Sequence, residues 1–182
     1  MATTKHTLIA LVEDKPGVLN RVASLFRRRG FNIESIAVGH SEVPHLSRMT
    51  IVVDGATTMV EQVRKQLDKV VDVVKVFDIT GDAMIARELA LIKVKATSST
   101  RSEIIEIVDI FRANIVDVAT DSVTIEVTGD EDKINSLFKL LRGFGIKEIA
   151  RTGRIAMARG VSGSLPVEKK SPKAQAKRQK TS

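Results

Sequence analysis

The chain has 182 residues, of which 43% are hydrophobic and 3% aromatic, and it contains no cysteine, tryptophan or tyrosine. The absence of cysteine excludes disulfides, thiolate metal sites and cysteine nucleophiles. No stretch approaches the roughly 18 uninterrupted apolar residues that a membrane span needs. The first apolar segment is short and soon followed by charge, unlike a signal peptide, so we expect a cytoplasmic protein without membrane contact.

The net charge of +7 is concentrated at the carboxyl end. Residues 161–182 hold six of the 29 Lys and Arg residues and one of the 22 Asp and Glu residues, a composition typical of a disordered tail. The remaining chain is nearly neutral and lacks the aromatic side chains on which bases stack, so we expect no specific nucleic-acid partner. The basic tail is either a solvated extension or a weak contact for polyanions.

In chain order, the first 80 residues predict strand, helix, strand, strand, helix, strand. The strands are expected at 6–13, 32–41, 47–54 and 70–79. Apolar residues at three- and four-residue steps predict a helix over 17–29, ended by Gly30 as a carboxyl-terminal cap. The residues that mark the two helices are Val18, Leu19, Val22, Leu25 and Phe26, and then Met59, Val60, Val63 and Leu67.

The same order then repeats from residue 88. A strand at 88–96 precedes a helix marked by Ile104, Ile107, Val108 and Phe111, and Asn114 stands where Asn32 stood. VTIEVTG (123–129) matches MTIVVDG (49–55), and a further helical stripe follows. The pattern therefore predicts an α+β fold of two tandem ferredoxin-like βαββαβ units, residues 5–80 and 81–160, with a join near Gly81. Such small units have exposed sheet edges, which favour self-association.

The first strand–helix junction, Asp14-Lys15-Pro16-Gly17, is not repeated in the second half. Pro16 in a helix's first turn presets φ, and Gly17 leaves the first-turn N–H donors open to a carboxylate. Asn32 offers an amide that both donates and accepts, and Asp14 could cap the helix or meet an ammonium group. Apolar neighbours would shape a pocket for an aliphatic side chain. The alternative is an ordinary turn, since Pro and Gly are common at helix starts. The apolar neighbours are Val18, Leu19 and Ile33.

The run DKPGVLNRVASLFRRRGFNIESIAVG, followed by LSRMTIVV, resembles the ACT domain of the small, regulatory subunit of acetolactate synthase (acetohydroxyacid synthase). The resemblance spans residues 5–160 and continues through RELALIKVKA, IFRANIVDV and IEVTGD. The combination of F-N-I-E-S, L-S-R-M-T and the two-unit layout is more specific than D-x-P-G alone.

The resemblance implies a non-catalytic subunit with no cofactor and no metal of its own. Its partner would be the large catalytic subunit, a transferase of branched-chain amino acid biosynthesis that carries thiamine diphosphate, Mg and FAD. It further implies activation of that partner and feedback inhibition by valine, or another branched-chain amino acid, at an ACT–ACT interface of a homodimer. The effector residues carried over are Asp14, Pro16, Gly17, Val18, Leu19, Asn32 and Ile33. Many relatives have Asn at the position of Asp14, so the polar group is retained but its charge differs.

Two other functions are less consistent with the sequence. An enzyme is disfavoured because His6, His40 and His45 lack partner carboxylates at metal-ligand spacing, and no serine has an elbow-like glycine context. A stand-alone ACT-type amino acid sensor acting on another partner is the alternative, although no helix-turn-helix segment accompanies the two units. The run Arg27 to Arg29 suits a helix carboxyl end, or else contacts a partner.

Overall fold

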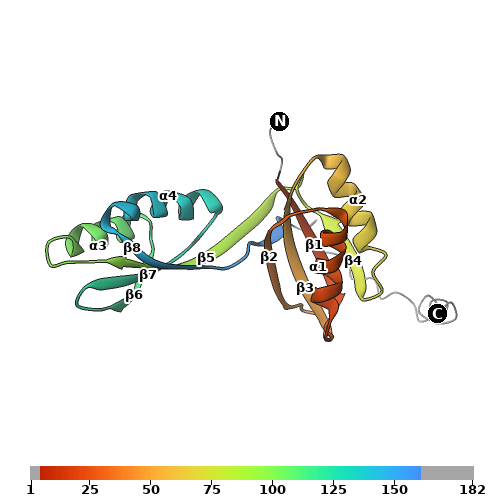
Figure 1. Ribbon diagram of the computed structural model, residues 1–182, viewed down its shortest axis with the longest axis horizontal. Helices are drawn as coiled ribbons and strands as arrows, with labels where there is room; N and C mark the ends of the chain where they lie inside the picture. Colours follow the sequence, from red (N-terminus) through yellow and green to blue (C-terminus); the bar gives the residue numbers. More distant parts are fainter. Residues whose placement is uncertain (1–4, 161–182) are drawn as a thin grey trace. The chain divides into compact units, whose positions relative to one another are not determined.

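The structure, a computed structural model, describes residues 5–160. The first half contains β1 (Lys5–Glu13), α1 (Val18–Arg29), β2 (Ile33–His40), β3 (Leu46–Asp54), α2 (Thr57–Leu67) and β4 (Val73–Asp78) (Figure 1). The second half repeats this order with β5 (Met84–Lys95), α3 (Arg101–Ile110), β6 (Asn114–Val118), β7 (Ser122–Gly129), α4 (Glu131–Leu141) and β8 (Ile146–Arg151). A short 3-10 helix, Arg142–Phe144, precedes β8, and a last strand, β9 (Ile155–Ala158), follows it.

The two halves form separate sheets with the same strand order. The first sheet is ordered β2-β3-β1-β4 and the second β6-β7-β5-β8, with β9 as a further partner of β5. β1 runs antiparallel to β3 and β4, as β5 does to β7 and β8. This arrangement confirms the predicted α+β fold of two ferredoxin-like units.

Within the described residues, the chain divides into two compact units. The first contains residues 5–34, 38–84 and 157–160, and the second contains residues 35–37 and 85–156. The domain boundaries inferred from the repeat, 5–80 and 81–160, remain predictions. The basic segment 161–182 lies outside the described residues.

The core of the first unit is built on β1, whose residues from Leu8 to Val12 are all at most 1% exposed. α2 contacts both β1 and β4, and α1 contacts α2. The predicted stripe of α1 is buried except for Leu19, which is half exposed. Each fully buried side chain of this size contributes about 1.5–3 kcal/mol to folding. The helix residues that complete this core are Val18, Val22, Leu25, Phe26, Val60, Val63 and Leu67.

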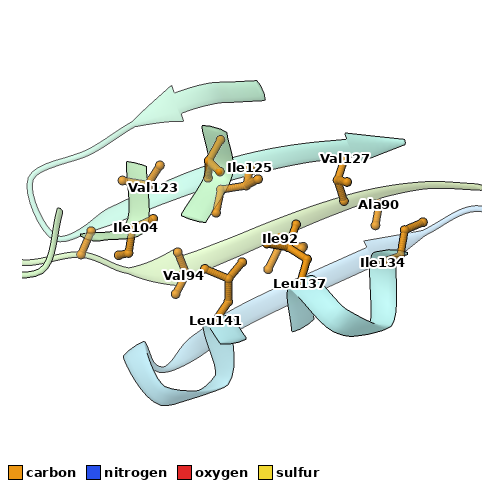
Figure 2. Packing of buried hydrophobic residues seen from close by; sticks show 12 residues of the cluster. Ala90, Ile92, Val94, Ile104, Val123, Ile125, Val127, Ile134, Leu137 and Leu141 are labelled. Atoms are coloured by element: carbon orange, nitrogen blue, oxygen red, sulfur yellow. The ribbon is translucent and has the colours of Figure 1, made fainter. Parts of the chain in front are cut away.

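The second unit has an equivalent core (Figure 2). Both helices lie on the same side of the sheet in Figure 1, and Figure 2 shows their apolar side chains facing those of β5 and β7. Alternate residues of each strand point to this side, as a period of two requires. The buried residues are Ala90, Ile92 and Val94 of β5, Val123, Ile125 and Val127 of β7, Ile104 of α3, and Ile134, Leu137 and Leu141 of α4.

Two details differ from the sequence-based expectation. α1 begins at Val18 with Gly17 as its N-cap residue, so Pro16 precedes the helix instead of occupying its first turn. The reason is the backbone of Gly17, whose φ of +85° is left-handed and cannot belong to a right-handed helix. β9 was not predicted, because four residues are too short to show a period.

Candidate functional site

The loop that joins β1 to α1 is exposed and turns on Gly17. An added Cβ at Gly17 would meet nothing within 4 Å, so space does not select glycine here. The φ of +85° at Gly17 selects glycine, because residues with a Cβ strongly disfavour the left-handed region. The loop therefore presents bare backbone at the start of a helix.

The first turn of α1 has open hydrogen-bond donors. The N–H groups of Leu19 and Asn20 have no partner among residues 5–160, and the N–H of Val18 reaches the Lys15 carbonyl only at 3.5 Å. No side chain caps the helix and no acidic residue lies in its first turn. Since the helix dipole adds positive potential at this end, the site favours a carboxylate or another small anion.

The corresponding loop of the second unit has more internal hydrogen bonds, although α3 also lacks a side-chain cap and its Ser102 and Glu103 N–H groups have no partner among residues 5–160. The Thr100 hydroxyl accepts the Thr97 N–H at 2.9 Å, and the Thr97 carbonyl accepts the Arg101 N–H at 3.0 Å. The Thr97 hydroxyl also lies 2.9 Å from that of Ser99. Glu103 occupies the first turn of α3, where its charge already complements the dipole. Because Glu103 repels a further negative charge, the second loop is less suited to an added anion than the first.

Asp14 joins the β1–α1 loop to the hairpin formed by β2 and β3. Its carboxylate accepts a hydrogen bond from the Ser47 hydroxyl at 3.3 Å, and its other oxygen lies 3.3 Å from Nδ1 of His40. The Asp14 N–H donates to the His45 carbonyl at 2.9 Å. These contacts hold Asp14 on the hairpin side of the loop, where its side chain stays 47% exposed.

Asn32, just before β2, is exposed, and its side-chain amide has no hydrogen bond to any described residue. Its counterpart in the second unit, Asn114, donates to Glu126 at 3.4 Å. The first unit therefore keeps this amide available, whereas the second unit uses it internally.

Comparison with known proteins decides the family. One family model, described as AHAS small subunit-like ACT domain, matches residues 8–75, and another, described as small subunit of acetolactate synthase, matches residues 87–160. A probable acetolactate synthase small subunit of Archaeoglobus fulgidus is 60% identical over 156 residues, covering 86% of this chain and 98% of that protein. The chain belongs to the acetolactate synthase small-subunit family.

Further members of this family agree. The acetolactate synthase small subunit of Mycobacterium bovis is 52% identical over 163 residues, which cover 90% of this chain and 97% of that protein. The crystal structure of the small subunit from Thermotoga maritima matches with a TM-score of 0.81 at 45% identity, over 86% of this chain and 98% of that one. The resemblance inferred from the sequence motifs is confirmed.

In this small subunit, the predicted site residues fall into two groups. Asp14, Pro16, Gly17, Leu19 and Asn32 are exposed, and Ile33 is partly exposed, so all six are accessible to a ligand. Val18 is 3% exposed and belongs to the core of the first unit, where it supports the helix start from inside. No hydrogen bond among the described residues links Asn32 to the loop Asp14–Gly17.

Two ion pairs fix the loop of this small subunit at its ends, and sequence reasoning missed both. Arg21 of α1 donates from Nη1 to Asp72, a buried residue whose carbonyl accepts the Glu13 N–H at 2.8 Å. The Glu13 side chain accepts a hydrogen bond from Lys15 at 2.7 Å, which raises the pKa of Lys15. Asp72 is 51 residues from Arg21, so no local pattern could have indicated that pair.

The three histidines considered for enzymatic chemistry differ in their exposure. His6 is buried in β1, while His40 and His45 are exposed near the hairpin. Within residues 5–160, no three His, Asp or Glu side chains gather as metal ligands. No helix of this part of the chain is long and apolar enough to cross a membrane.

Proposed function

We propose that this chain is the non-catalytic regulatory subunit of acetolactate synthase. It binds the large catalytic subunit, raises its activity and makes it sensitive to feedback inhibition by valine or another branched-chain amino acid. Family membership and the ACT match to residues 8–75 support this role. We place effector binding in the ACT domain, residues 5–80, followed by an ACT-like domain, residues 81–160. Thiamine diphosphate, Mg and FAD are expected on the large subunit, and the complex is expected in the cytoplasm.

The observation that carries the effector proposal is a combination found in the first unit alone, namely open first-turn N–H groups with no acidic residue in that turn, together with an unpaired asparagine amide before the next strand. The N–H groups of Leu19 and Asn20 suit the α-carboxylate of an amino acid. The Asp14 carboxylate suits the ammonium group, and the Asn32 amide can bind either end. The exposed side chain of Leu19 and the partly exposed side chain of Ile33 would contact an aliphatic side chain.

A second copy of the chain is proposed to complete the site. β2 is an edge strand of the first sheet and carries Val38, which is 49% exposed. An exposed edge pairs readily with another strand, so two ACT domains would join edge to edge as a homodimer. Asn32 lies directly before this edge strand, so the effector would be shared between the copies.

An effector shared by two copies acts through its different affinity for two arrangements of them. We propose that valine stabilises the arrangement that activates the catalytic subunit less. A coupling free energy of roughly 1–3 kcal/mol gives a 5- to 150-fold change in affinity, which is sufficient for feedback control.

Co-expression with the large subunit of the same organism tests the proposal. Acetolactate formation by the large subunit should rise when this chain is added, and valine should reduce the activity of the complex. The matched variant Asn32→Ala should keep the activation and lose the inhibition, whereas Asn135→Ala, in the second unit, should keep both. Failure to bind or activate the large subunit, with retained valine binding, would favour a stand-alone amino acid sensor. Pyruvate turnover by this chain alone would contradict a non-catalytic role.

A further inference from the structure

We infer that His40 and Ser47 are positioning residues of the effector site. They hold the Asp14 carboxylate for the ammonium group of the amino acid, and the charge of His40 sets how strongly Asp14 attracts it. The inference rests on the proposed function and adds two residues and a pH response to it.

The Asp14 side chain and backbone are both held by contacts with the β2–β3 hairpin. One carboxylate oxygen accepts the Ser47 hydroxyl, the other faces His40, and the Asp14 N–H is bound by the His45 carbonyl. His40 ends β2, and Ser47 lies at the start of β3. The two strands of one hairpin therefore contact different oxygens of the Asp14 carboxylate. Ser47 is 6% exposed, whereas the His40 side chain is 86% exposed.

The other charged groups of these segments are already occupied among the described residues. Glu13 and Lys15 form a pair at 2.7 Å. Glu42 attracts Arg48 on the same hairpin. His45 contacts Asp14 through its backbone carbonyl. His40 is therefore the titratable side chain that acts directly on the Asp14 carboxylate.

The two charge states of His40 have opposite consequences for a ligand. When His40 is neutral, the negative charge of Asp14 is available to attract the ammonium group. Protonated His40 neutralises that charge and places a cation beside the ammonium group, so effector affinity should fall. Histidine side chains change charge between about pH 5 and 8. Because the pair is exposed, we expect affinity to be about two- to fivefold higher at pH 8 than at pH 6.

Isothermal titration of the full chain with valine at pH 6 and pH 8 tests the inference, with leucine and isoleucine as alternative ligands. His40→Gln cannot be protonated and should bind equally at both pH values. Ser47→Ala should bind valine more weakly at both pH values and keep the wild-type ratio of the two affinities. The matched control His45→Asn, which suits the left-handed backbone of that residue, should behave as the wild type. Melting temperatures would identify variants that act through folding.

A double-mutant cycle separates positioning from a general structural role. In an Asp14→Asn background, His40→Gln should change neither affinity nor its pH dependence, because the charge on which His40 acts is gone. The inference would be overturned if His40→Gln kept the wild-type ratio of valine affinities at pH 8 and pH 6, or if the effects of Asp14→Asn and His40→Gln were additive. Valine binding by the wild type would still leave the proposed function intact. No binding of any branched-chain amino acid by the wild type would overturn both.

Discussion

Gly30 and Arg112 occupy the same position in the two halves, at the end of the same helix-terminating motif. The Gly30 N–H donates to the Arg27 carbonyl and the next N–H, of Phe31, to the Phe26 carbonyl. After α3, Arg112 and Ala113 repeat both bonds. Both positions are left-handed, with φ of +69° and +48°. Both halves therefore contain this Schellman motif, although only the first has the glycine that suits it.

Arg112→Gly should therefore stabilise the protein. Glycine adopts the left-handed region without the steric cost that the arginine Cβ imposes, and the gain in the free energy of unfolding should be about 1 kcal/mol. Chemical denaturation followed by circular dichroism measures it. Arg112→Ala is the matched control, since it removes the long side chain and keeps the Cβ. An equal gain in both variants would show that the side chain, and not the backbone, is responsible.

Gly17→Ala should destabilise the first unit and weaken effector binding. The φ of +85° costs an alanine about 1 kcal/mol, although nothing blocks its methyl group. Any relief of this strain moves the N–H groups of Leu19 and Asn20, so valine affinity should fall as well. Gly81→Ala, at an exposed glycine without positive φ and with open space around it, should alter neither quantity. Unchanged valine affinity in a folded Gly17→Ala protein would remove these donors from the site.

The sequence predicted the βαββαβ order of both units, though not β9, because alternation and helical stripes report burial directly. Ile104 and Val108 could be assigned to a buried helix face because the apolar spacing of α1 recurs in α3. The loop was harder, since Pro16 suggested a position in the first helical turn, whereas the left-handed Gly17 makes the helix begin at Val18. The contacts of Asp14 with His40 and Ser47 join strands that only the fold brings together, so no spacing could indicate them.

His6→Leu should stabilise the first unit. His6 is 4% exposed in β1, and neither ring nitrogen has a hydrogen-bond partner among the described residues. Asp78 lies 3.8 Å from Nδ1, too far for a hydrogen bond. Leucine is similar in size and buries no polar atom, so the free energy of unfolding should rise by about 1 kcal/mol. In His40→Leu, at an exposed position, thermal denaturation should show no such gain. A loss of stability in His6→Leu would mean that the ring is solvated or paired in the folded state.

Glu88 should be the acidic residue whose neutralisation harms the second unit most. It is 7% exposed and accepts a hydrogen bond from Arg151 at 2.6 Å, while Arg154 lies 3.4 Å away and also pairs with Glu131. Glu88→Gln keeps the shape but leaves two guanidinium groups facing a neutral amide, so the free energy of unfolding should fall by about 2 kcal/mol.

Urea denaturation of Glu88→Gln and of Glu148→Gln provides the matched comparison. Glu148 lies on the neighbouring strand β8 and is exposed, so its neutralisation should change stability by less than about 0.5 kcal/mol. In a double-mutant cycle, the effects of Glu88→Gln and Arg154→Met on the free energy of unfolding should not be additive. The reason is that each substitution removes the same ion pair between Glu88 and Arg154. Additive effects would mean that the buried carboxylate is held by β8 alone, through Arg151, and that Arg154 is bound by Glu131.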